Sequence, residues 1–190
     1  MRTLFVGDVH GCSDELEALL TITEPTRIIL LGDIFTKGPS PVEVWNLIQS
    51  HNMEAVFGNH DELILMKKKK KRRLPKEARK WIQHLPIFIQ GPTWMAVHGG
   101  VNPYGPTLKT EAMYMRKWPL NGKKSRFWWK RYQGEKLILY GHDAKRQLQD
   151  HRPRTLGLDS GCVYGFCLTG YLLEEDRLYQ IPAKQAYCPI

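Results

Sequence analysis

The first third of the chain alternates short apolar runs with segments whose apolar residues recur at helical spacing. Residues 3–6, 27–31 and 54–57 are apolar-rich runs of strand length. Between them, residues 13–20 and 39–50 place their apolar side chains on one face of a helix. Strands that alternate with helices in this way predict an α/β domain with parallel crossovers.

The second half has a different pattern, in which few helices separate many short strands. Helices are expected at residues 60–66, 74–84 and 107–118. Strands are expected at 87–90, 94–98, 136–140, 155–158, 166–173 and 178–181. We therefore expect a parallel first sheet and a second, mixed sheet packed on it. The length of 190 residues predicts a single domain, residues 1–190.

The composition is that of a globular protein with an excess of positive charge. No apolar stretch is long enough to span a membrane, so no membrane association is expected. The formal net charge of +9 favours anionic partners such as phosphate esters, nucleotides or nucleic acid. The four cysteines lack CxxC spacing and the chain begins without a signal-peptide pattern, so we expect a cytoplasmic protein with free thiols. Nothing in the sequence indicates an oligomeric state.

Side chains that can bind metals follow the predicted strands, one or two after each. Asp8 and His10 stand two residues apart and could reach one ion, while Asp33 could bridge two ions with its two carboxylate oxygens. Glycines stand just before several of these residues, where the backbone must turn sharply. The predicted ligand set is Asp8, His10, Asp33, Asn59, His98 and His142.

This set predicts a dinuclear-metal phosphatase or pyrophosphohydrolase. Two ions about 3.5–4 Å apart can clamp the attacking and leaving oxygens of a phosphoryl transfer. Oxygen and nitrogen ligands without thiolate favour Mn²⁺, with Fe or Zn²⁺ as alternatives, over Ca²⁺. His60, which adjoins Asn59, could protonate the leaving oxygen as a general acid.

The motifs resemble those of calcineurin-like metallophosphoesterases in the phosphoprotein phosphatase superfamily. The resemblance rests on Gly-Asp-Val-His-Gly at residues 7–11, Gly-Asp at 32–33, Gly-Asn-His-Asp at 58–61 and His-Gly-Gly at 98–100. It implies a four-layer αββα sandwich with the dinuclear site at one edge of the sheets. It also implies the ligand roles given above, with His60 as the proton donor.

The second motif departs from the protein-phosphatase pattern, Gly-Asp-x-Val-Asp-Arg-Gly. Thr36 stands in place of the second Asp, so the acidic partner expected to orient His60 is absent, and Lys37 replaces the phosphate-binding Arg. This departure, with Gly-His-Asp at 141–143 and Leu-Asp-Ser-Gly-Cys at 158–162, resembles the ApaH-like branch of symmetrical diadenosine tetraphosphatases. The resemblance implies phosphate-binding roles for three residues: Lys37, Asn59 and Arg116.

The leading hypothesis is a bis(5'-nucleosyl)-tetraphosphatase, with a dinucleoside polyphosphate as the anionic substrate. One alternative is a serine/threonine protein phosphatase, against which Thr36 and Lys37 count. Another is a hydrolase of capped RNA or polyphosphate. An inactive nucleotide-binding module is disfavoured, because only catalysis requires all six ligands.

Two basic segments leave alternatives open. Residues 67–73 are seven consecutive basic residues, which form either a solvated loop or a binding strip for a polyanion. Residues 121–133 mix basic and aromatic side chains, either as a surface segment anchored by tryptophans or as a stacking platform for a base.

Overall fold

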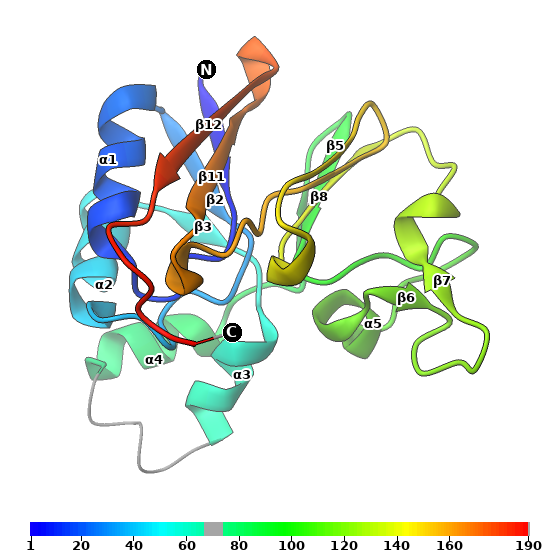
Figure 1. Ribbon diagram of the computed structural model, residues 1–190, viewed down its shortest axis with the longest axis horizontal. Helices are drawn as coiled ribbons and strands as arrows, with labels where there is room; N and C mark the ends of the chain where they lie inside the picture. The colour runs from blue at the N-terminus through cyan, green and yellow to red at the C-terminus, as the bar shows by residue number, and fades with distance from the viewer. Residues whose placement is uncertain (67–73, 190) are drawn as a thin grey trace.

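The computed structural model describes residues 1–66 and 74–189, and within these ranges two five-stranded sheets pack face to face (Figure 1). The first sheet has the order β12 (Arg177–Pro182), β11 (Cys167–Leu172), β1 (Thr3–Val6), β2 (Arg27–Leu30) and β3 (Glu54–Ala55). The second has the order β4 (Phe88–Gln90), β5 (Trp94–Val97), β8 (Leu137–Tyr140), β10 (Thr155–Gly157) and β9 (Gln149–His151). The α-helices are α1 (Ser13–Thr23), α2 (Pro41–Ser50), α3 (Asn59–Met66), α4 (Lys76–Gln83) and α5 (Lys109–Tyr114).

The first sheet is parallel only in part. Strands β1, β2 and β3 are parallel neighbours, as predicted. Strand β11 pairs antiparallel with β1, with Tyr171 opposite Phe5, and β12 pairs antiparallel with β11. The prediction of a wholly parallel first sheet is therefore wrong, and so is the expectation that residues 166–173 and 178–181 belong to the second sheet. The chain returns to the first sheet after completing the second, and such distant pairing leaves no local mark in the sequence.

The second sheet is mixed, as predicted. Strands β5, β8 and β10 are parallel, and β4 and β9 are antiparallel edge strands. The helix expected over 107–118 ends at Tyr114, and Lys117–Trp118 (β6) forms a hairpin with Arg126–Phe127 (β7). The backbone is already extended at Met115, with ψ of 119°, and residues 117–118 form strand hydrogen bonds with β7 in place of helical ones.

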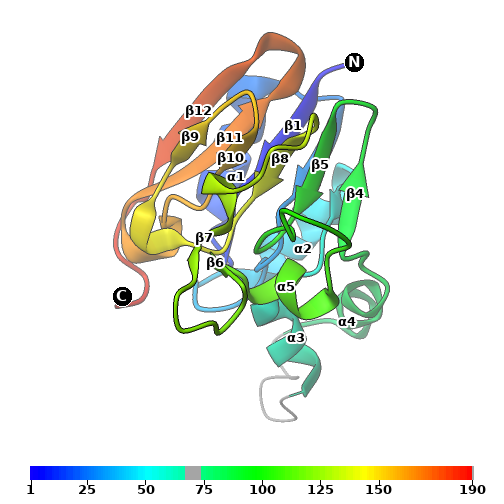
Figure 2. The same ribbon diagram turned by 90° about the vertical axis from the view of Figure 1, so that its right-hand side faces the viewer.

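Alternating side chains of the strands divide the core into three apolar layers. Leu4 and Val6 of β1 pack toward the helices, while Phe5 points between the two sheets. In β8, Leu139 joins Phe5 in the middle layer, and Ile138 packs outward against other apolar side chains. Figure 1 shows α5 and the hairpin β6–β7 on the side of the second sheet that faces away from the first, and in Figure 2 this side is toward the viewer. The αββα sandwich is therefore confirmed, although its fourth layer is mostly irregular.

None of the helices in the described part of the chain is long and apolar enough to cross a membrane. The basic segment 67–73 lies outside the described residues, so both interpretations of it stay predictions.

Candidate metal centre

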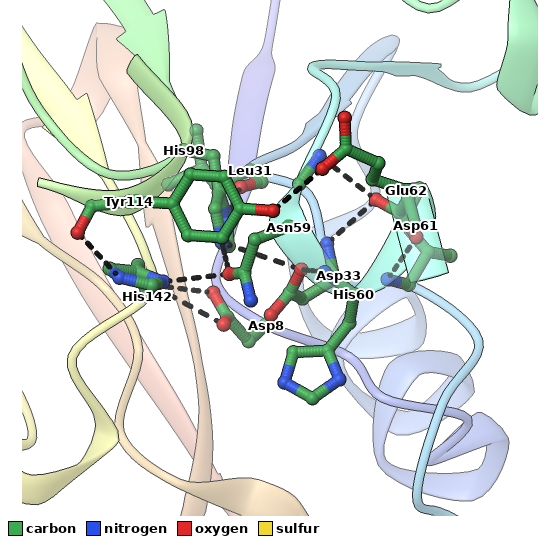
Figure 3. Close-up of polar contacts among 12 residues, drawn as sticks. Asp8, Leu31, Asp33, Asn59, His60, Asp61, Glu62, His98, Tyr114 and His142 are labelled. Carbon is green, nitrogen blue, oxygen red and sulfur yellow. Dashed lines mark hydrogen bonds and ion pairs between the residues drawn. The ribbon is translucent and has the colours of Figure 1, made fainter. Parts of the chain in front are cut away.

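The predicted metal-binding side chains converge at one end of the two sheets: Figure 3 shows Asp8, Asp33, Asn59, His98 and His142 together, and His10 lines the same pocket. They come from the turns after β1, β2, β5 and β8 and from the start of α3. A single pocket of about 570 Å³ is lined by most of the candidate residues: Asp8, His10, Asp33, Lys37, Asn59, His60, Arg116 and His142. His98, the remaining candidate ligand, is fully buried beneath them.

The turns that carry the ligands pack tightly against one another, and several of their residues have a strained backbone conformation. His10, Asp33 and His142 have φ of 48°, 54° and 71°, in the left-handed region that residues other than glycine rarely adopt. A Cβ atom at Gly141 would lie 2.1 Å from Asp8 Oδ1, so only glycine fits between the first and last ligand turns. Backbone strain at this density is typical of functional sites.

The first ligand set consists of Asp8, His10 and Asp33, whose donor atoms lie within 4.8 Å of one another. His10 Nε2 is 4.0 Å from Asp8 Oδ2 and 3.7 Å from Asp33 Oδ2. The other ring nitrogen, Nδ1, contacts Thr36 Oγ1 at 2.9 Å. Thr36, at the position expected to hold a partner of His60, therefore orients His10 instead.

The second set consists of Asp33, His98 and His142, again within 4.8 Å. His98 Nδ1 lies 2.7 Å from the carbonyl oxygen of Leu31, and His142 Nε2 lies 3.2 Å from that of Tyr114. Each of these nitrogens donates to its carbonyl, which turns the opposite ring nitrogen toward the site. The opposite ring nitrogens, His98 Nε2 and His142 Nδ1, lie 2.9 Å and 2.8 Å from Asn59 Oδ1. Asp33 thus belongs to both sets, as a bridging carboxylate would.

The buried charges of the site suit divalent cations. Burial and the neighbouring carboxylate of Asp159 raise the pKa of Asp8, and burial raises the pKa of Asp159 to about 6. Burial would also raise the pKa of Asp33, but the adjacent His98 imidazole lowers it below its usual range. Three buried carboxylates with oxygen and nitrogen neighbours, and no thiol among them, fit two divalent metal ions.

The histidines differ in protonation. Burial lowers the pKa of His10 to about 3 and that of His142 to about 2, so both are neutral at pH 7. Burial acts in the same direction on His98, but Asp33 and Asp8 outweigh it and raise the His98 pKa to about 10. His10 and His142 therefore offer a lone pair at neutral pH, whereas His98 must first lose a proton.

Two acidic residues that the sequence interpretation left without a firm role support the ligands. Asp61 is fully buried and accepts hydrogen bonds from the backbone N–H groups of Asp33, Ile34 and Gly58 at 2.9, 3.1 and 3.1 Å. Asp143 accepts two hydrogen bonds from Arg146 and forms an ion pair with Arg116 at 3.3 Å. Both belong to the sequence motifs, but only the fold shows what they contact.

The wall of the pocket combines positive charge with aromatic rings. The lining side chains that do so are Lys37, Arg116, Lys145, Arg146, Tyr164 and Phe166. Lys37 Nζ donates to the Tyr164 hydroxyl at 2.7 Å and lies 3.3 Å from His10 Nε2. Arg116 donates to the carbonyl oxygen of His142 at 2.7 Å, and about half of its side chain is exposed. His60 sits at the same opening, with its ring 5.1 Å from that of His10.

The aromatic segment 121–133 does not present a free stacking platform. The Arg146 guanidinium covers the ring of Phe127 at 4.1 Å, and Phe127 stacks on Trp129 at 5.3 Å. Trp129 in turn stacks on His151 at 4.1 Å, and Trp128 is fully buried. These rings stack on one another and on Arg146, which lines the pocket, so the interpretation as an anchored surface segment is favoured.

The chain is similar to known phosphoesterases over most of its length. Residues 1–169 match the calcineurin-like phosphoesterase family. The chain is 26% identical to the asymmetrical bis(5'-nucleosyl)-tetraphosphatase PrpE of Oceanobacillus iheyensis, over 98% of this chain and 94% of that protein. It is 33% identical to the symmetrical bis(5'-nucleosyl)-tetraphosphatase of Mannheimia succiniciproducens, over 54% of this chain and 45% of that protein. A crystal structure of a candidate diadenosine tetraphosphatase superposes with a TM-score of 0.89 and 28% identity, covering 96% of this chain and 93% of that one.

Proposed function

Because this chain belongs to the calcineurin-like phosphoesterase family, we propose that it is a bis(5'-nucleosyl)-tetraphosphatase that uses two divalent metal ions. One observation carries the proposal: two ligand sets share Asp33 at the floor of a pocket with basic and aromatic walls. Metal ions there would face a polyphosphate, and the rings would face a base.

The proposed ligands are histidines, carboxylates and one amide. They form two sets: Asp8, His10 and Asp33 for one ion, and Asp33, Asn59, His98 and His142 for the other. We propose Mn²⁺ as the native ion, with Fe or Zn²⁺ as alternatives, because the donors are oxygen and nitrogen. When bound, the two ions would supply Lewis-acid activation of water and of the phosphoryl oxygens.

The surrounding side chains would bind the substrate and move the proton. Lys37, held by Tyr164, and Arg116, held by Asp143, point positive charge into the pocket and would bind phosphoryl oxygens. His60 lines the opening beside His10 and would donate a proton to the oxygen of the departing nucleotide. Thr36, which stands where the protein phosphatases carry an Asp, contacts His10, so the proton-donor role is proposed for the His60 imidazole itself.

The aromatic side chains support a substrate with a nucleobase over inorganic polyphosphate or a phosphoprotein. Phe166 is 40% exposed and lines the pocket together with Tyr164, an arrangement suited to stacking a nucleobase. Inorganic polyphosphate and phosphoserine carry no ring for these side chains to contact. The proposed substrate is therefore a dinucleoside polyphosphate. The four free cysteines support a reducing, cytoplasmic location for the protein.

We further propose asymmetrical cleavage. The sequence alone predicts symmetrical cleavage, but the symmetrical relative from M. succiniciproducens matches only about half of the chain, whereas the PrpE relative matches nearly all of it. Asymmetrical hydrolysis breaks an outer phosphoanhydride bond and yields ATP and AMP. Symmetrical hydrolysis breaks the central bond and yields two ADP.

Anion-exchange chromatography of the products of diadenosine tetraphosphate, with Mn²⁺ and then with excess chelator, tests the proposal. Equal amounts of ATP and AMP, lost with chelator, would support it in full. Two ADP would support the enzyme class and overturn the cleavage position. If the dinucleotide stays intact while a phosphopeptide, capped RNA or polyphosphate is hydrolysed, the proposed substrate is wrong.

A further inference from the structure

A second group of potential metal ligands lies outside the pocket. The Sγ atoms of Cys12 and Cys162 and a carboxylate oxygen of Glu15 all lie within 4.8 Å of one another. All three residues are buried, with at most 1% of each exposed. None of them lines the pocket that holds the proposed dinuclear centre.

The Glu15 carboxylate is only half satisfied. Its Oε1 accepts hydrogen bonds from the backbone N–H of Lys184 at 2.9 Å and from the Tyr187 hydroxyl at 2.8 Å. Its Oε2 is buried and has no hydrogen-bond partner among residues 1–66 and 74–189. A buried carboxylate oxygen without a donor is costly, and a cation beside it would compensate the charge.

The three residues are brought together from segments that are distant in sequence. Cys12 directly precedes α1 and Glu15 lies in its first turn, a spacing of three that places both on one helix face. Cys162 opens the short 3₁₀ turn that follows β10. Figure 1 shows α1 with the C-terminal segment running beside it, and that segment contributes Lys184 and Tyr187.

We propose that Cys12, Glu15 and Cys162 form a separate zinc site with three protein ligands. Two thiolates and one carboxylate favour Zn²⁺ over Mn²⁺ or Mg²⁺, because sulfur is a soft ligand. Binding would release the two thiol protons and place a divalent cation beside the buried Glu15 carboxylate, one oxygen of which has no hydrogen-bond partner among the described residues. The ion would tie the turn after β1 to the turn after β10. Since Cys12 follows His10 by two residues, it would also brace the ligand turn of the dinuclear site.

Cobalt substitution tests this site without relying on activity. Co²⁺ bound to thiolate gives an intense charge-transfer band in the near ultraviolet, whereas the dinuclear centre has no sulfur ligand and cannot produce it. The intact protein loaded with Co²⁺ is expected to show this band and to hold three ions per chain rather than two. The Cys12→Ser/Cys162→Ser variant should lose the band and one ion. The matched Cys167→Ser variant, whose thiol lies outside the group, should keep both.

Two results would overturn the proposal: an intact protein without the band, or a band that persists in the double variant. If the double variant does not fold, Glu15→Gln serves in its place, because the amide preserves the shape of the carboxylate. The Glu15→Gln variant is expected to weaken the Co²⁺ binding that produces the band by more than about tenfold. Unchanged affinity in that variant would exclude Glu15 as a ligand. If Glu15→Gln keeps the band at unchanged affinity but loses turnover on the dinucleotide, the substitution acts on the dinuclear site and the zinc proposal is overturned.

Discussion

The side chain of Asp61 holds the backbone of Asp33, because its Oδ2 accepts the Asp33 N–H at 2.9 Å. The same carboxylate binds the N–H groups of Ile34 and Gly58, so it ties together the turns that carry two proposed ligands. Asp61 does not belong to either ligand set, and its contribution acts through the position of Asp33. An outer carboxylate of this kind fixes the geometry of a metal site.

Replacing Asp61 with Ala should weaken both metal binding and folding. Three buried N–H groups would lose their acceptor, which we expect to lower the free energy of unfolding by about 3 kcal/mol. Metal affinity and kcat/KM should fall about 10- to 100-fold, as for other outer residues of metal sites. Thermal unfolding and metal titration measure the two effects. Glu77→Gln, an exposed acidic residue of α4, is the matched control and should change neither. Wild-type metal affinity in the Asp61 variant would contradict this role.

Replacing His60 with Ala should slow the chemical step and leave the metal content unchanged. General acid catalysis typically contributes about 10²- to 10⁴-fold, so kcat on the dinucleotide should fall by that factor. A substrate with a better leaving group, such as p-nitrophenyl phosphate, needs less protonation and should be slowed much less. His51→Ala, at an exposed position that does not line the pocket, is the control. Equal losses on both substrates would argue that His60 positions the substrate or metals instead.

Metal binding should release protons at neutral pH. The metal-free His98 has a pKa of about 10, raised by Asp33 and Asp8 against the effect of burial, so it is protonated at pH 7. An ion must take the lone pair of Nε2, and it displaces that proton. Affinity should therefore rise with pH, by up to about tenfold per unit below the His98 pKa. Calorimetric titration in buffers of different ionisation enthalpy counts the protons. Release of at least one is expected, and none would show that His98 is neutral.

Replacing Phe166 with Ala should weaken binding of the nucleoside and spare the polyphosphate. Stacking on an aromatic side chain contributes about 1–3 kcal/mol, so KM for diadenosine tetraphosphate should rise roughly tenfold. KM for inorganic tripolyphosphate should stay unchanged, because it has no base. Phe88→Ala removes an exposed phenyl ring from β4, outside the pocket, and is the control. A similar increase for both substrates would mean that Phe166 shapes the pocket rather than stacking a base.

The sequence predicts the strands and helices that carry the ligands better than it predicts which strands pair in each sheet. Strands β1, β2 and β3 and the helices between them follow from local apolar spacing, and the polar motifs after them meet as expected. The return of β11 to pair with Phe5 and its neighbours depends on contacts more than 160 residues apart, as in the pair Leu4 and Leu172. No local pattern encodes such a pairing.

Individual contacts in the site also could not be predicted from the sequence. Thr36 stands at the position where the sequence motif leads one to expect an Asp, but only the fold shows that its hydroxyl contacts His10. The aromatic segment has the composition of a stacking platform, yet Phe127 and Trp129 use their faces on Arg146 and His151. Composition identifies which side chains are available, whereas packing decides which of their surfaces remain free.

The most direct test of the account is anomalous X-ray scattering from crystals of the protein grown with Mn²⁺. Two manganese peaks about 3.5–4 Å apart are predicted, with the Asp33 carboxylate between them and His10 and His98 on opposite ions. Crystals of the Asp33→Asn variant should lose at least one peak while keeping the fold. A single ion at full occupancy, or two ions that do not share Asp33, would contradict the dinuclear centre.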